Sequence, residues 1–362
     1  MTALMLLLLA WGSAPHPGSV ARGDPCAPLR SLAGAPCAPK PCLRTECDRL
    51  VHILSVQARL VSGPCIYWAQ GIESRTTLDD AGVKRICVPP EQVDAWKAAG
   101  FSATPAAASD LASREELPPP GVTARAGLAS PTRSPWVVAS GWHVARNPAA
   151  KYVYTVPTGK AALAAAEAFA YGADAVIKID PADLASAGAM MAFLETVPSA
   201  DLSPVVDFAV VDDGSAVTGE VMNLLTRRNL LFRSVKSPDS RFRINVRIGS
   251  PEYPKEEAAD PSAFAQKIRS QLTDDQRSLR IFGSEVVIGR LIGDGSRARL
   301  HLLNYGGRDI EGLRVRVRGT YRSGEAYIAG AGKVALVDQT AADGSTEFSL
   351  PRLQTYAVVD LK

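Results

Sequence analysis

The sequence predicts an α/β fold, either a reduced β/α barrel or a doubly wound parallel sheet, followed by an all-β C-terminal sandwich. Two observations lead to this prediction, and a third concerns the compartment in which the protein folds. Apolar runs of strand length alternate with helical patterns over residues 66–278, which is typical of a parallel sheet. From residue 279 onward, polar and apolar residues alternate between closely spaced turn residues, which is typical of a sandwich. All six cysteines lie near the start of the chain, behind an apolar leader.

The leader is an apolar run over residues 3–11. It is about half as long as the roughly 20 residues that a membrane-spanning helix needs, so it favours a secretory signal over a transmembrane helix. Small residues at Ser19-Val20-Ala21 provide a cleavage site, which predicts a signal peptide over residues 1–21. We therefore expect a secreted or periplasmic protein with no membrane span in the mature chain.

Residues 22–65 form a segment rich in cysteine and proline, with little apolar material of its own. In an oxidising compartment, six cysteines can form three disulfides, and the sequence leaves all 15 connectivities open. A zinc site is the alternative, but the chain has no C-x-x-C pair and His52 is the only histidine nearby. We predict disulfides, no metal site and no cofactor. The cysteines concerned are Cys26, Cys37, Cys42, Cys47, Cys65 and Cys87.

Residues 66–102 are predicted to hold the first β/α units. Strands are expected over 66–72 and 84–88, and a helix over 91–99 ends at Gly100. Residues 103–135 are rich in alanine, proline and serine and have no apolar period. That composition predicts a linker or a long surface excursion.

Residues 136–278 are predicted to form an α/β domain, in which the run VVDFAVV at 205–211 is the clearest buried strand. Residues 279–362 are predicted to form the β-sandwich domain. Glycine-containing turns at 293–295, 306–307 and 343–344 separate its strands.

The net charge is +3, from 40 basic and 37 acidic residues spread along the chain. This balance gives no electrostatic footprint for nucleic acid, so we expect no nucleic-acid partner. The sequence leaves the oligomeric state open.

Three parts of the chain resemble known enzymes. Residues 164–180 (AAAEAFAYGADAVIKID) resemble the last helix–strand unit of glycosidase β/α barrels. The α/β stretch from Val205 resembles the amidotransferase-like middle domain of three-domain bacterial β-galactosidases, and the C-terminal strands are similar to the sandwich that ends many such enzymes. The resemblance implies a carbohydrate partner, an oligo- or polysaccharide. It transfers no catalytic residue, because the Asn-Glu pair of those β-galactosidases is absent here.

Glycoside hydrolysis uses two carboxylates placed across the bond that is cleaved. In parallel α/β folds such groups lie just beyond the carboxyl ends of strands. Glu73, Asp180 and Asp212 satisfy this positional test and are the catalytic candidates. Each also has a structural interpretation: helix capping for Asp180, a turn or cap for Asp212, and a surface ion pair for Glu73.

Trp142, His143 and Asp213 are the candidate ligand-binding residues. A tryptophan beside a histidine after a strand suits a sugar ring and its hydroxyl groups, although a structural histidine is the alternative. Asp213 follows the buried strand at 205–211, where it can equally serve the turn. Arg314, Arg316 and Arg318 must line one face of a strand, which fits either an anionic polysaccharide or solvent.

The sequence thus predicts an exported, glycosidase-like protein that binds or processes carbohydrate, with or without catalysis. Two alternatives stay open. One is an active glycoside hydrolase with paired carboxylates, and the other is a structural or protein-interaction module of the cell envelope.

Overall fold

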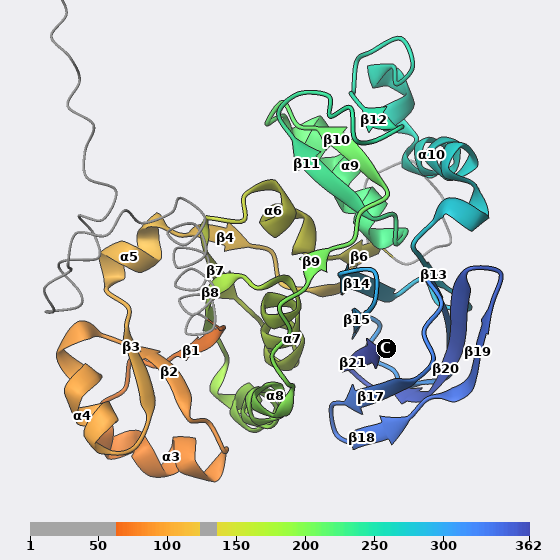
Figure 1. Ribbon diagram of the computed structural model, residues 1–362. Helices are drawn as coiled ribbons and strands as arrows, with labels where there is room; N and C mark the ends of the chain where they lie inside the picture. The colour runs from red at the N-terminus through yellow and green to blue at the C-terminus, as the bar shows by residue number, and fades with distance from the viewer. Residues whose placement is uncertain (1–62, 124–135) are drawn as a thin grey trace, which may run out of the picture. The chain divides into compact units, whose positions relative to one another are not determined.

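The structure is a computed structural model that describes residues 63–123 and 136–362 (Figure 1). The predicted signal peptide, most of the cysteine-rich segment with Cys26, Cys37, Cys42 and Cys47, and residues 124–135 lie outside the described residues. No helix in the described ranges is long and apolar enough to cross a membrane.

The first sheet has six parallel strands in the order β3-β2-β1-β8-β7-β4. From β1 toward one edge of the sheet, the strands follow the order of the chain: β1, β2, β3. From the other edge inward the order continues as β4, β7 and β8, and β8 lies beside β1. A β/α barrel has this cyclic order, so the sheet is a barrel-like sheet that is open between β3 and β4. The strands are β1 (Cys65–Tyr67), β2 (Arg85–Val88), β3 (Ser102–Pro105), β4 (Glu115–Leu117), β7 (Lys151–Thr155) and β8 (Asp174–Lys178).

Short helices connect these strands, and two longer helices follow β7 and β8. The helices are η1 (Ile72–Ser74), α3 (Arg75–Asp80), η2 (Pro90–Gln92), α4 (Val93–Ala98), α5 (Ala108–Ser113), α6 (Gly141–Arg146), α7 (Ala161–Tyr171), η3 (Pro181–Asp183) and α8 (Leu184–Thr196). The predicted α/β class is confirmed.

The described part of the segment predicted as a linker contains strands and a helix. Residues 103–123 complete β3, form α5 and supply β4, one edge of the barrel-like sheet, as well as β5 (Gly121–Thr123). β5 pairs with β6 (Trp136–Val138) in a separate antiparallel ribbon. These strands have few apolar side chains, because edge strands are stabilised largely by backbone pairing with the neighbouring strand; their composition therefore resembles that of a linker.

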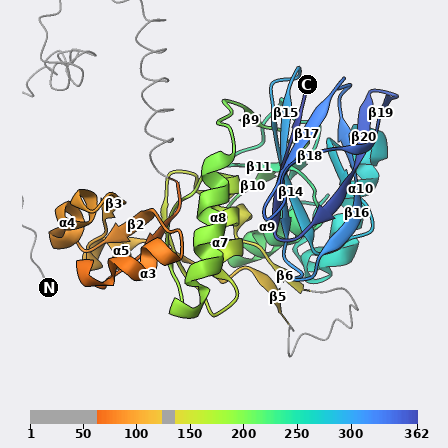
Figure 2. The same ribbon diagram turned by 90° about the horizontal axis from the view of Figure 1, so that it is seen from below.

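Helices α7 and α8 stand between the barrel-like sheet and the C-terminal sandwich (Figures 1 and 2). Alanines fill most of α7, and eight of its eleven residues are buried. Small side chains allow the helix to be packed on more than one side, and its core cluster includes Leu303 and Tyr356 of the sandwich. One face of the sandwich therefore packs against the hydrophobic cluster that also lies behind the barrel-like sheet.

Gly188 brings α8 into close contact with the turn that follows α3. A Cβ at this position would lie 1.8 Å from the backbone oxygen of Ala81. We expect Gly188→Ala to lower the free energy of unfolding by about 2 kcal/mol, because the backbone must move to admit the methyl group. Urea unfolding measures the loss, and Ala189→Ser at an exposed position of the same helix is the control. An unchanged Gly188→Ala midpoint would show that the two segments are not in contact.

The strands of the predicted domain over 136–278 belong to several sheets. β6 pairs with β5, β7 and β8 join the barrel-like sheet, and three later strands form a small parallel sheet of order β11-β10-β12. Their order places the first strand in the middle, so a topological switch point lies between β10 and β12. The elements are β10 (Phe208–Val211), α9 (Ala216–Arg227), β11 (Phe232–Val235), β12 (Asn245–Val246), η4 (Lys255–Ala259) and α10 (Pro261–Gln276).

The C-terminal region is an antiparallel sandwich, as predicted. Its two sheets have the orders β13-β16-β20-β19 and β18-β17-β21-β15-β14-β9, with one hydrophobic cluster between them. The strands are β9 (Ser203–Pro204), β13 (Leu279–Ile281), β14 (Val287–Gly293), β15 (Ala298–Asn304), β16 (Ile310–Arg318), β17 (Gly324–Ile328), β18 (Gly332–Ala335), β19 (Val337–Ala342), β20 (Ser345–Leu353) and β21 (Tyr356–Leu361).

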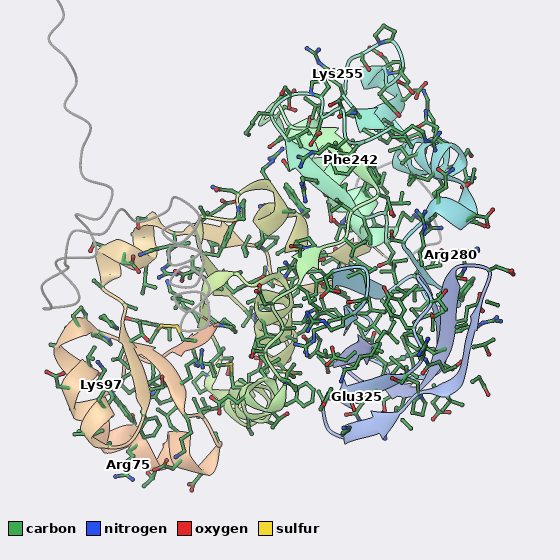
Figure 3. All side chains as sticks on the ribbon, viewed as in Figure 1. Arg75, Lys97, Phe242, Lys255, Arg280 and Glu325 are labelled. Carbon is green, nitrogen blue, oxygen red and sulfur yellow. A yellow bond between two sulfur atoms is a disulfide. The ribbon has the colours of Figure 1, made fainter. Side chains whose placement is uncertain are left out.

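Cys65 and Cys87 form a disulfide between the neighbouring strands β1 and β2 (Figure 3). Both side chains are buried, in a small cluster with Leu111 of α5 and Val176 of β8. The prediction of a disulfide is confirmed for this pair. The other four cysteines lie outside the described residues.

Candidate ligand-binding cavity

A cavity of about 400 Å³ lies where α6, the ends of α7 and α9, β11 and β14 meet. Its volume falls in the range of roughly 300–1,000 Å³ that is usual for small-molecule sites. Aromatic, aliphatic and arginine side chains form the wall. Its most distinctive lining residues are Trp142, Arg146, Tyr171, Phe232, Arg233 and Arg290.

Helix α6 carries Trp142 and Arg146 into this wall. The helix approaches Tyr171 closely, since a Cβ at Gly141 would lie 2.0 Å from the tyrosine ring. The Trp142 ring lies against the ring of His143, with centroids 3.7 Å apart. The Arg146 guanidinium is 5.3 Å from the centroid of the Trp142 ring. Trp142 is therefore partly committed to packing within α6, and only its remaining surface lines the cavity.

Asp212 follows β10, at the carboxyl edge of the small parallel sheet. Its side chain is fully buried and accepts hydrogen bonds from Arg146 Nη2 at 2.8 Å and from the Gly214 amide at 3.0 Å. Lys236 Nζ lies 3.5 Å from Oδ2 of Asp212. The aspartate is thus held between two cations and is absent from the cavity lining. This arrangement suits a residue that positions Arg146, which contacts both Trp142 and Asp212.

Asp213 is exposed and serves the start of α9. Its Oδ1 accepts hydrogen bonds from the Ser215 amide at 2.9 Å and from the Thr218 hydroxyl at 2.8 Å. The Ser215 amide is the main cause that lowers the pKa of Asp213 to about 2, and the Ser215 and Thr218 hydroxyl groups add to it. The turn-and-cap interpretation of Asp213 accounts for these contacts.

His143 connects α6 to the barrel-like sheet. Its Nδ1 lies 3.0 Å from Oε1 of Glu115 on β4, and its backbone oxygen accepts a hydrogen bond from the Tyr152 hydroxyl. Burial lowers the pKa of His143, although Glu115 opposes this shift, and Arg146 lowers the pKa further. These contacts fit the structural interpretation of this histidine.

Glu73 and Asp180 lie beyond the carboxyl ends of the paired strands β1 and β8. Glu73 accepts a hydrogen bond from the Gly71 amide. Asp180 caps η3 by accepting from the Ala182 amide, and its other oxygen accepts from the Thr158 hydroxyl. Asp212 belongs to the other parallel sheet, so the three predicted catalytic carboxylates do not share one sheet edge.

The start of α7 lies at this same edge and is already occupied by a carboxylate. Asp183 is buried and accepts hydrogen bonds from the backbone amides of Gly159, Lys160 and Ala161. A helix N-terminus attracts anions, and here the chain supplies its own.

Sequence reasoning missed Arg233 and Arg290. Arg290 on β14 donates to the backbone oxygen of Ala170, and its guanidinium is 5.1 Å from the centroid of the Tyr171 ring. Arg233 on β11 lies 5.9 Å from the ring of Phe242, which Figure 3 labels. Within the described ranges, neither guanidinium forms an ion pair. For Arg290 the available signal was a charged residue inside the apolar strand VIGRLIG, whereas the half-polar run FRSV gave no such signal for Arg233.

Asn229 was also missed. It has a positive φ of 52° just after α9, a conformation that asparagine tolerates better than most residues. Its amide donates to the Val287 oxygen at 3.0 Å, and its Oδ1 accepts from the Gly289 amide at 2.7 Å. The side chain thereby fixes the end of α9 to β14 and sets the spacing of two cavity walls.

No family model and no curated protein sequence matches this chain. Among solved structures, the chain resembles alpha-L-fucosidase isoenzyme 2 from Paenibacillus thiaminolyticus, with a TM-score of 0.48, 10% identity, and coverage of 86% of this chain and 80% of the fucosidase. It also resembles the beta-galactosidase from Bacillus circulans sp. alkalophilus, with a TM-score of 0.36, 9% identity, and coverage of 82% and 60%. A third is a catalytic mutant of Gan42B, a GH42 beta-galactosidase from G. stearothermophilus, with a TM-score of 0.34, 8% identity, and coverage of 68% and 53%.

These three solved structures are an alpha-L-fucosidase and two beta-galactosidases. The chain spans less than two thirds of the length of the two beta-galactosidases. The likeness concerns the arrangement of secondary-structure elements, and no residue role is transferred from these enzymes.

Proposed function

We propose that this is an exported protein that binds an oligo- or polysaccharide in the cavity and does not hydrolyse it. The observation that carries the proposal is the composition of the cavity wall, which combines aromatic rings and hydrogen-bond donors and includes no carboxylate. Hydrolysis of a glycoside needs two carboxylates about the bond that is cleaved. A site without them can hold a sugar but lacks the acid and the base.

The wall suits a sugar ring because such a ring presents both C–H groups and hydroxyl groups. Phe232 and the free surface of Trp142 offer apolar contact, while Ser234 and the arginines offer hydrogen bonds. A mostly apolar wall with a few polar groups is the usual composition of a small-molecule site.

Export is supported by the apolar leader and by the disulfide between Cys65 and Cys87, because disulfides persist in oxidising compartments. We propose a secreted or periplasmic location on this basis. Detection of the chain in the cytosolic fraction with its leader intact would contradict it.

Binding of the mature chain to a panel of oligosaccharides tests the proposed function. We expect Phe232→Ala to weaken binding of the selected glycan by about 10-fold, because an aromatic contact is removed from the wall. Phe282→Ala is the matched control, since Phe282 lies on the sandwich, outside the cavity lining. Its binding should equal that of the wild type.

Three outcomes would contradict the proposal. Equal losses in Phe232→Ala and Phe282→Ala would place the binding site elsewhere. Release of sugar that disappears in Glu73→Gln or Asp180→Asn would show an active hydrolase. A panel without any bound glycan would favour a structural or protein-interaction module.

A further inference from the structure

We propose that the sugar bound in the cavity carries a carboxylate, as a uronic acid does, and that Arg233 and Arg290 bind this carboxylate. The inference rests on the proposed function and names the class of sugar. It starts from an imbalance of charge among the side chains that line the cavity.

The lining contains three arginines and no aspartate, glutamate or lysine. Arg146 is compensated, because it pairs with the buried Asp212 at 2.8 Å. Within the described part of the chain, Arg233 and Arg290 have no such partner. Arg233 does act on the nearby Asp239, whose pKa it helps to lower, but that carboxylate is itself paired with Arg241. The described lining therefore brings two cations to one concave site and contributes no carboxylate of its own, and a concave wall of one charge concentrates ligands of the opposite charge.

In the described ranges, the contacts of Arg290 fix its guanidinium and leave some of its N–H donors without a protein partner. One of its N–H groups donates to the Ala170 oxygen, and the plane of the guanidinium rests near the Tyr171 ring. A guanidinium has five N–H donors, so further donors remain for a ligand. Burial also lowers the pKa of Arg290, which reflects a cation with little water around it and no counter-charge. An incoming carboxylate would supply that charge.

The choice of carboxylate follows from the chemistry of arginine. Its planar fork forms two parallel hydrogen bonds to a carboxylate, and these bonds are stronger than those between neutral groups. A neutral sugar could use the same N–H groups only through single hydrogen bonds. The cavity should therefore discriminate between an acidic sugar and its neutral counterpart.

Calorimetric titration of the mature chain tests this with a matched pair of probes, a trimer of galacturonic acid and the same trimer with its carboxyl groups methyl-esterified. We expect the acid to bind at least about 10-fold more tightly than the ester. Added salt should weaken binding of the acid and leave binding of the ester unchanged, because salt screens charged pairs. A sulfated trimer of galactose forms a third arm, and tighter binding of that probe would overturn the carboxylate assignment.

The arginines are tested individually. We expect Arg233→Gln and Arg290→Gln each to weaken binding of the acid by about 10-fold or more, with binding of the ester unchanged. Arg290→Lys retains the charge without the planar guanidinium and covers the case in which Arg290→Gln does not fold. This variant should also bind the acidic trimer more weakly than the wild type does. Arg322→Gln, at an exposed position of the sandwich, should bind like the wild type.

The outcomes separate the two proposals. Equal affinity for acid and ester, or full affinity of the arginine variants for the acid, overturns the carboxylate inference and leaves carbohydrate binding intact. Absence of binding by both trimers, together with every neutral oligosaccharide of the panel, overturns the proposed function as well.

Discussion

Glu167→Ala should lower the free energy of unfolding by about 4 kcal/mol. Glu167 is fully buried in α7 and accepts three hydrogen bonds. Its Oε1 accepts from the Ser140 amide at 2.7 Å and from the Tyr305 hydroxyl at 2.5 Å, and its Oε2 accepts from the Tyr154 hydroxyl at 2.9 Å.

The size of the effect comes from what the substitution leaves behind. Alanine removes the acceptor of three buried donors, and each unsatisfied buried group costs about 1–3 kcal/mol. It also opens a cavity at the junction of the barrel-like sheet and the sandwich, because Tyr305 belongs to the sandwich and Tyr154 to the sheet.

Urea unfolding of the full mature chain measures the loss. Glu195→Ala, at an exposed glutamate of α8, is the control and should change stability by less than about 0.5 kcal/mol. A Glu167→Ala variant as stable as this control would show that the three donors find other partners and that the network does not join the two regions.

Glu167 also predicts a dependence on pH. Burial raises its pKa in the folded protein, and the hydrogen bonds from Tyr305, Ser140, Tyr154 and Gly141 only partly oppose this shift. The unfolded chain therefore loses the proton at lower pH than the folded chain does, so the contribution of Glu167 to stability falls as pH rises from its ordinary pKa of 4.5 through the folded value. Relative to Glu167→Gln, which cannot ionise, the wild type should lose stability over this range. A constant difference between the two proteins would contradict the shift.

The sequence was sufficient to predict the α/β class and the sandwich because both depend on periodic patterns. It was insufficient for β3 and β4. The run SATP and the run EEL have no apolar alternation, and they become strands because β2 and β7 offer them backbone partners. Pairing with a distant segment is a property of the folded sheet, and local composition does not record it.

The sequence likewise identified some residues of the candidate site and missed others. Trp142 does line the cavity, and the structural interpretations of Asp180 and Asp213 account for their hydrogen bonds. Arg233 and Arg290 could not be identified, because the cavity exists only where β11, β14 and α6 meet. Glu167 and Tyr305 illustrate the same point, since 138 positions separate two side chains that share one hydrogen bond.

Removal of the disulfide by Cys65→Ala together with Cys87→Ala should lower the free energy of unfolding by about 3 kcal/mol. The bond closes a loop with a sequence separation of 22, and the loss of chain entropy in the unfolded state for a loop of this length corresponds to roughly 3 kcal/mol. The two strands that it joins are short and lie in the middle of the barrel-like sheet. Because the bond restricts the unfolded chain, the effect should appear as a lower thermal midpoint.

The double variant isolates this bond, whereas a reductant acts on every disulfide that the chain contains. Reductant should lower the midpoint of the wild type at least as far as that of the double variant, because it removes the Cys65–Cys87 bond and any other. Alanine at both positions also leaves small cavities beside Leu111 and Val176. A Val176→Ala variant with the disulfide intact measures the cost of opening that cluster alone. If the double variant unfolds at the midpoint of the oxidised wild type, the crosslink contributes nothing to stability and the entropic account of this end of the chain fails.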